Sequence, residues 1–217
     1  MATNNSIGNG LKTEQLRSLA TELHGLRDYP PIVSKGNGKY EGDILGFVKG
    51  LRISARIIYF LREQLSDMDY EINWGHLLDD AEASCSPDCD IIIHIKGHVR
   101  KWNDTNKPIM DFNFIKAKNA EIVVSCKSKL GKIDKEYPKS LKKYGVNYIF
   151  LVAECCKEIQ YHSLKKRARR AGYAGLYCLY FMDKNETMKC DESVHAEFIN
   201  VIRKVLIKAK QKRESRE

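Results

Sequence analysis

The chain has 217 residues, of which 43% are hydrophobic and 30% charged, and this fits one globular domain with its own core. No apolar run approaches the roughly 20 residues of a membrane span, and the N-terminus lacks a signal-peptide core, which argues against a membrane or secreted protein. The 37 Lys and Arg exceed the 28 Asp and Glu, giving a formal net charge of +9. This excess favours a polyanionic partner such as nucleic acid.

The seven cysteines are an odd number and unevenly spaced, and Cys126 and Cys178 lie inside apolar runs. We interpret them as reduced thiols, which predicts a cytoplasmic protein. The histidines His94 and His98 follow Cys89 too closely for a zinc finger. His94 lies within a strand-like run, and we interpret it as a structural residue.

The first third of the chain favours helices. Residues 1–10 are polar and rich in Gly and Asn, and we expect a flexible N-terminus. Apolar residues at helical spacing predict a helix over Leu11–Leu26 and, after a breaker rich in Pro and Gly, a longer helix over Glu41–Leu65. A short strand is expected at Tyr70–Trp74, followed by an acidic, irregular segment at 79–86.

The rest of the chain alternates strands with helices. Three adjacent isoleucines predict a buried strand at Cys89–Ile95, and the polar segment 96–114 predicts a long loop or a hairpin extension. The remaining predicted elements are strands at Glu121–Cys126, Asn147–Glu154 and Gly175–Met182, and helices at Lys135–Tyr144, Lys157–Ala171 and Ser193–Lys212. This alternation predicts an α/β fold, a mixed central sheet flanked by helices on both faces. We expect one domain over residues 11–212 and a charged tail at 213–217.

Two neighbouring predicted strands carry a candidate site for phosphodiester hydrolysis. Asp90 opens one apolar strand and Lys127 closes the next. Because side chains alternate along a strand, Ser125 and Lys127 share a face while Cys126 points away. Mg²⁺ needs only one or two carboxylates and a carbonyl besides water, so Asp90 and the backbone carbonyl of Cys126 could hold it. Lys127 would then orient the attacking water, and we expect Asp90 and Lys127 both to face solvent.

These residues resemble the PD-(D/E)xK nuclease superfamily. The resemblance rests on Pro87-Asp88-x-Asp90 before a hydrophobic strand and on a second strand ending in Lys127-Ser128, and it covers about residues 41–155. It implies a single restriction-endonuclease-like domain with an αβββαβ core and dependence on Mg²⁺, for which Mn²⁺ can substitute. It further implies a DNA endonuclease of the type II restriction or defence kind, with RNA a less favoured substrate.

One position departs from the superfamily pattern. The residue two before the lysine is usually Asp or Glu, and here it is Ser125. Glu41 on the long helix is our first candidate for the missing acid, and Glu136 on the next helix is the second. Glu121 lies on the same strand, but about 13 Å from Ser125 along an extended chain. Asp88 is the alternate to Asp90 as the first metal ligand. If no glutamate reaches the site, the chain would be a weakened or inactive module that binds nucleic acid or a protein partner.

Partner surfaces are the last expectation from the sequence. A dense basic cluster predicts contacts with nucleic-acid phosphates, and it comprises Lys165, Lys166, Arg167, Arg169 and Arg170. A two-fold homodimer would match the symmetry of duplex DNA. The apolar stripe of the last helix could form its interface or pack into the chain's own core, and it comprises Val194, Phe198, Val201, Ile202, Val205 and Leu206. A separate partner subunit or a methyltransferase is a further candidate.

Overall fold

The fold is known from a computed structural model, which describes residues 14–15, 17–22, 39–102, 112–185 and 187–215. The predicted flexible residues 1–10 and parts of the first predicted helix lie outside the described residues. Helical backbone is present within 14–22, in agreement with the expected helix at that place.

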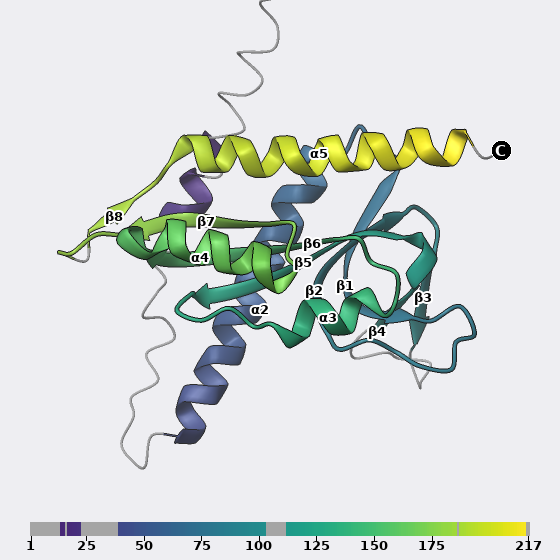
Figure 1. The fold of residues 1–217 in the computed structure, drawn as a ribbon, viewed down its shortest axis with the longest axis horizontal. Coiled ribbons are helices and arrows are strands. Elements are labelled where there is room, and N and C mark those ends of the chain that lie inside the picture. The colour runs from purple at the N-terminus through teal and green to yellow at the C-terminus, as the bar shows by residue number, and fades with distance from the viewer. Residues whose placement is uncertain (1–13, 16, 23–38, 103–111, 186, 216–217) are drawn as a thin grey trace, which may run out of the picture.

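An eight-stranded mixed sheet forms the centre of the molecule (Figure 1). Its spatial order is β3-β4-β1-β2-β5-β6-β7-β8. The strands are β1 (Tyr70–Leu78), β2 (Cys89–Ile95), β3 (Val99–Trp102), β4 (Phe112–Lys116), β5 (Ala120–Lys129), β6 (Tyr148–Lys157), β7 (Gly175–Met182) and β8 (Met188–Lys189). Strands β5, β6 and β7 run parallel, β1 and β4 also pair in parallel, and the remaining pairs are antiparallel.

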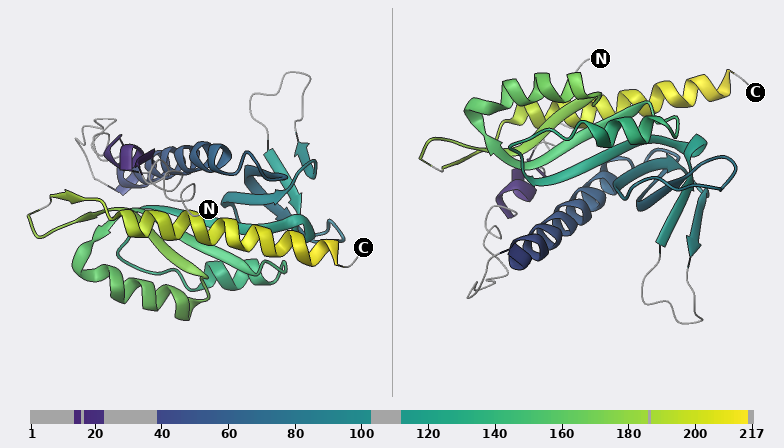
Figure 2. Two further views of the ribbon diagram at one scale, coloured as in Figure 1. Left: turned by 90° about the horizontal axis from the view of Figure 1, so that it is seen from above. Right: turned by 60° about the horizontal axis from the view of Figure 1, so that its bottom comes forward.

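Helices cover both faces of this sheet (Figure 2). They are α2 (Lys39–Gln64), α3 (Glu136–Lys142), α4 (Glu158–Ala171) and α5 (Glu192–Glu214), with a short 3₁₀ helix η1 (Ala117–Asn119). Helix α2 packs on β5, β1 and β2, and α4 packs on β7 and β6 on the other side. The predicted α/β fold, with a mixed central sheet flanked by helices, is therefore confirmed, and α2, β1, β2, β5, α3 and β6 follow the predicted αβββαβ order.

Element boundaries follow the apolar runs except where the sheet ladder continues beyond them. Strands β2 and β7 have the predicted bounds. Strand β5 runs on past Cys126 because Lys127 and Lys129 pair with β6, and β1 continues to Leu78 because it pairs with β4. The predicted hairpin extension is formed by β3 and β4, whereas β8 was not predicted. Helix α5 ends at Glu214, two residues beyond the expected end of the domain at residue 212.

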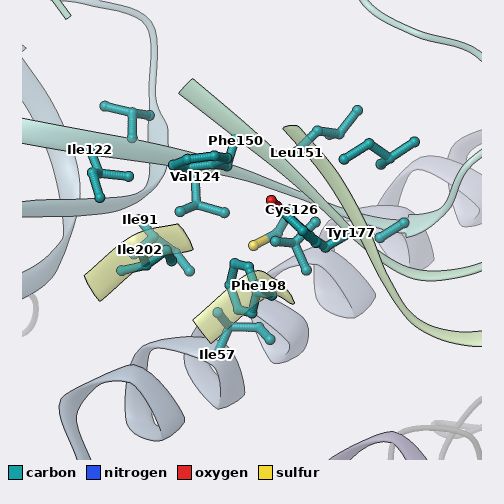
Figure 3. Packing of buried hydrophobic residues seen from close by; sticks show 14 of the residues in the cluster. Ile57, Ile91, Ile122, Val124, Cys126, Phe150, Leu151, Tyr177, Phe198 and Ile202 are labelled. Atoms are coloured by element: carbon teal, nitrogen blue, oxygen red, sulfur yellow. The ribbon is translucent and has the colours of Figure 1, made fainter. Parts of the chain in front are cut away.

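The core lies where α2 and α5 meet the middle of the sheet (Figure 3). Ile57 of α2 and Phe198 of α5 pack against side chains of the central strands, including Ile91 and Val124. The rings of Tyr177 and Phe198 are 5.1 Å apart between centroids. Each fully buried side chain of this kind contributes roughly 1.5–3 kcal/mol to folding, so these contacts fix the strands that carry the candidate site.

The C-terminal helix α5 is bound tightly to the start of β1. The Tyr70 hydroxyl donates to the backbone carbonyl of Leu206 at 2.9 Å, and Arg213 forms an ion pair with Glu121 on β5. The apolar stripe of α5 is buried in the chain's own core apart from the half-buried Val201. The stripe therefore does not provide the dimer surface considered for it, because its side chains are already covered.

A bulge in β1 lets the β3–β4 hairpin approach closely. The register of β1 against β2 shifts between Asn73 and Gly75. Gly75 has a φ of +154°, and a Cβ there would overlap the backbone carbonyl oxygen of Asn113. The Asn113 side-chain amide donates to the carbonyl of Trp74 at 2.9 Å, which holds the two segments together. Only glycine fits this position without a shift of the backbone.

The cysteines and His94 lie mostly in the interior of the fold. All seven cysteines are free thiols, and five of them are buried. His94 is fully buried between Asn73 and the carbonyl of Ile95, at 2.9 and 2.8 Å from its two ring nitrogens. This agrees with its interpretation as a satisfied structural residue. In the described part of the chain, no helix is both long and apolar enough to cross a membrane.

Candidate active site

Asp90 lies at the start of β2, just beyond the last backbone pair between β2 and β5, Ile91 with Val124. Its carboxylate oxygen Oδ2 accepts a hydrogen bond of 2.7 Å from the backbone N–H of Cys126. In a strand the N–H and C=O of one residue leave on the same side, so the Cys126 carbonyl also points toward the Asp90 edge. The Asp90 side chain is thus bonded to β5 and half-buried, and the expectation that it faces solvent is wrong.

Burial is the main cause of a raised pKa at Asp90. The Cys126 N–H, the Lys127 ammonium and a hydrogen bond from the Ser125 hydroxyl act in the opposite direction, while the charge of Asp88 adds to the rise. The net effect is a carboxylate that is costly to keep charged in the folded protein without a cation beside it.

Lys127 and Ser125 lie on the face of β5 that carries the candidate site. The Cys126 side chain between them is 4% exposed and points into the core shared with α2, as the alternation along the strand predicts. Lys127 is exposed, which confirms that part of the expectation, and no carboxylate of the described residues lies within ion-pair distance of it. Ser125 is 2% exposed, and its hydroxyl lies close enough to Asp90 to lower the pKa of that carboxyl slightly, against the larger effect of burial. The three residues nominated from sequence therefore come together at the junction of β2 and β5.

Two tyrosines complete the surroundings of Asp90, and sequence reasoning missed both. The Tyr137 hydroxyl donates to the backbone carbonyl of Asp88 at 3.2 Å, and burial raises the pKa of this phenol well above its usual value. Burial also raises the pKa of Tyr173, and the charge of Asp90 adds to the rise at both phenols. Asp134 accepts from the backbone N–H groups of Glu136 and Tyr137 at the start of α3, and the bond from Tyr137 to Asp88 ties this helix to the segment before β2.

The glutamates considered as replacements for the missing acid have different surroundings. Glu136 is the first residue of α3, its side chain is 80% exposed, and it pairs with Lys139 at 2.8 Å. Glu121 is engaged by Arg213 near the opposite end of β5. Glu41 belongs to the first turn of α2, but its side chain lies outside the part that the structure describes. The buried Glu154, which the sequence did not suggest, accepts from the Tyr180 hydroxyl at 2.8 Å and lies 3.7 Å from Arg52.

The oxygen atoms at this site can hold one hard divalent cation, and water would complete its coordination. Asp90 offers a desolvated carboxylate and Cys126 a backbone carbonyl, and Mg²⁺ accepts such oxygen ligands while keeping several waters. Asp88 is exposed two residues earlier and could add a second carboxylate. Among the described residues, no group of three His, Cys, Asp or Glu side chains forms a ready-made metal cluster. The site thus fits a weakly held divalent ion rather than a closed structural one.

The basic cluster of α4 is only partly free for nucleic acid. Lys165 is bound to Glu197 of α5 at 2.8 Å and lies 5.8 Å from the ring centroids of Tyr161 and Tyr177. The other four cations remain exposed, and they are Lys166, Arg167, Arg169 and Arg170. Helix α4 ends at Gly172, next to Lys142 and Pro138 of α3. The C-terminal end of α4 therefore lies close to α3, the helix that flanks Asp90.

Solved structures of NucC have the same fold. The cAAA-bound form of NucC from P. aeruginosa ATCC27853 is 13% identical in sequence, with 92% of this chain and 90% of that chain covered and a TM-score of 0.61. The cAAA-bound form from E. coli MS115-1 is 10% identical, with the same coverage and a TM-score of 0.62. Its apo form covers 69% of this chain and 82% of that chain, with 10% identity and a TM-score of 0.50. The sequence matches no family model and no curated protein. The likeness therefore concerns the α/β fold.

Proposed function

We propose that the chain is a metal-dependent endonuclease that hydrolyses phosphodiester bonds in DNA. The observation that carries this proposal is the junction of Asp90, the Cys126 backbone and Lys127 on neighbouring strands of a restriction-endonuclease-like sheet. The net charge of +9 and the exposed cations of α4 support a nucleic-acid substrate. The fold shared with NucC supports the same reaction class.

Each residue of the site would have its own role in hydrolysis. Asp90 and the Cys126 carbonyl would hold Mg²⁺ or Mn²⁺, with Asp88 as a further ligand. When bound, the ion lowers the pKa of a water and offsets negative charge on the phosphate. The Lys127 ammonium orients the attacking water and stabilises charge that develops on the phosphoryl oxygens. Tyr137 and α3 shield one side of Asp90 from solvent and keep its carboxylate directed at β5.

Cleavage of plasmid DNA by the purified chain tests this proposal. Supercoiled plasmid is incubated with Mg²⁺, with Mn²⁺ or with EDTA, and a Lys127→Met variant is compared with Lys204→Met, which removes an exposed lysine of α5. We expect cutting only with a divalent ion, and a loss of about 10²–10³-fold in Lys127→Met alone, as for removal of one charge-stabilising donor. Because two of the NucC structures contain cAAA, each reaction is repeated with cAAA added. Equal cutting by wild type and Lys127→Met would contradict the assignment.

A non-catalytic nucleic-acid-binding module is the second candidate. The specific observation in its favour is Ser125, a buried hydroxyl beside Asp90 where the superfamily usually supplies a second carboxylate. The same reactions separate the two candidates when DNA retention in a gel is recorded beside cutting. Binding without cutting under every metal and cAAA condition would select the module. Sedimentation of the same samples tests the homodimer.

A further inference from the structure

A cavity of about 760 Å³ lies at the carboxyl ends of the three parallel strands β5, β6 and β7. Figure 1 shows these ends together beside β8 and the start of α4. Four lysines line the cavity: Lys129, Lys157, Lys184 and Lys189. Only two acids do so, Glu158 and Asp183. No part of this cavity was nominated from the sequence, because the strand ends, α4 and β8 meet only in the folded chain.

The two acids of the cavity are already engaged. Glu158 pairs with Lys189 at 3.2 Å. Asp183 accepts from the backbone N–H groups of Asn185 and Thr187, at 2.8 and 2.9 Å, within the turn that leads to β8. In the described part of the chain, no carboxylate pairs with Lys129, Lys157 or Lys184. The cavity therefore presents three lysines without a counter-charge to solvent.

The start of α4 adds a second feature that favours an anion. This helix of 14 residues begins at Glu158, and the preceding Lys157 has no side-chain hydrogen bond to its first turn. The first amides of a helix have no partner within the helix, and together with the helix dipole they attract phosphate. Beside them Ile159 is 77% exposed, the largest exposed fraction among the large hydrophobic side chains of the described residues. A ligand with a phosphate and an apolar or planar part would use both features.

The cavity begins two residues beyond the candidate active site along β5, at Lys129. Lys127 and Lys129 lie on the same face of β5, about 7 Å apart along the strand. That separation is comparable to the span of one nucleotide in a nucleic-acid strand. Building on the proposed nuclease function, we propose that this cavity binds the nucleotide next to the scissile phosphate on the same DNA strand. Lys129, Lys157 and the start of α4 hold its phosphate, and Ile159 contacts its sugar or base.

A salt titration of DNA binding tests this inference without requiring cleavage. The variant Lys129→Gln/Lys157→Gln is compared with Lys96→Gln/Lys204→Gln, which removes the same charge at two exposed lysines outside the cavity. Binding of a fluorescent duplex is measured in EDTA by anisotropy over a series of salt concentrations. We expect the log–log slope to flatten by about 0.9 for each phosphate that the cavity variant no longer neutralises. The control variant should retain the wild-type slope.

A third variant, Ile159→Ser, separates the apolar contact from the charges. It should weaken binding at every salt concentration while leaving the slope unchanged, because no charge is removed. All variants alter exposed side chains, and thermal unfolding verifies that each remains folded.

The outcomes distinguish this inference from the nuclease proposal. A cavity variant with the slope of its control overturns the inference and leaves the nuclease proposal standing. A flattened slope in a protein that never cuts DNA supports the cavity and overturns the nuclease proposal. Absence of DNA binding by the wild type overturns the cavity's role as well.

Discussion

Replacing Asp90 separates what its charge does from what its hydrogen bond does. Asp90→Asn removes the charge but keeps an oxygen that can accept from the Cys126 N–H, whereas Asp90→Ala removes both. An unpaired buried donor costs about 1–3 kcal/mol, so the Ala variant should be less stable than the Asn variant by that amount. For a chain of this length this corresponds to roughly 2–12 °C in Tm, at about 2–4 °C per kcal/mol.

The charge of Asp90 predicts how the stability of Asp90→Asn compares with that of wild type. Burial raises the folded-state pKa of Asp90, so its ionised form opposes folding at neutral pH. Asp90→Asn should therefore equal or exceed the stability of wild type in EDTA at pH 7. The stability advantage of Asp90→Asn should shrink as the pH falls through the raised pKa. It should vanish below the ordinary pKa of 3.8, where the carboxyl is protonated in both the folded and the unfolded state.

Thermal unfolding followed by circular dichroism measures these differences, first in EDTA and then with Mn²⁺. A bound ion stabilises the folded state by about 2.7 kcal/mol at 100 times its Kd, and only wild type should gain this increment. Activity should be lost in both variants. A Tm for Asp90→Asn below that of Asp90→Ala would refute the role given to the Cys126 hydrogen bond. An equal gain from Mn²⁺ in all three proteins would refute Asp90 as the ligand.

Four further substitutions test three separate features. Lys127→Met should change the free energy of unfolding by less than about 0.5 kcal/mol, because the side chain is exposed, so an unfolded variant would contradict its position. Burial lowers the pKa of His94, so the unfolded chain takes up a proton first, and stability should fall as the pH drops below 6.5, by at most about 1.4 kcal/mol per pH unit. Urea unfolding at pH 7 and pH 5 measures this, and His94→Gln should remove that part of the slope. Gly75→Ala should cost about 1–3 kcal/mol through overlap with Asn113, whereas Gly50→Ala, which meets open space in α2, should stabilise by about 0.5–1 kcal/mol. Equal melting temperatures for these two glycine variants would argue against the close approach.

The sequence was most informative where one physical effect dominated. Strands β2 and β7 consist of apolar residues almost throughout and are bounded by polar turns, so burial alone predicts their ends. The meeting of Asp90 with Ser125 and Lys127 followed from strand alternation and from the neighbouring positions of the two strands. What could not be predicted depends on contacts between distant segments. The Tyr137 phenol reaches Asp88 only because α3 packs over the start of β2, and a tyrosine before Pro138 carries no signal of that position.

The carboxylate that is missing at position 125 also shows that local sequence does not predict contacts between distant segments. Ser125 was recognised as a departure, but a helix glutamate can replace a strand carboxylate from many places in the sequence. Which glutamate reaches Asp90 depends on the orientation of a whole helix and not on local spacing. The cavity at the strand ends is a further case, since its lysines come from four separate segments.

The attachment of α5 to β1 has a consequence for synthesis on the ribosome. Arg203 donates to the carbonyl of Gln64 at 2.6 Å, across 139 positions of sequence, and the bond from Tyr70 to Leu206 spans 136. Contacts of such separation form late and slow the folding of a domain. The part of the sheet that α5 covers therefore stays open until residues 192–214 have left the exit tunnel. A nascent chain would need protection of that part by a chaperone until α5 has emerged and packed against the sheet.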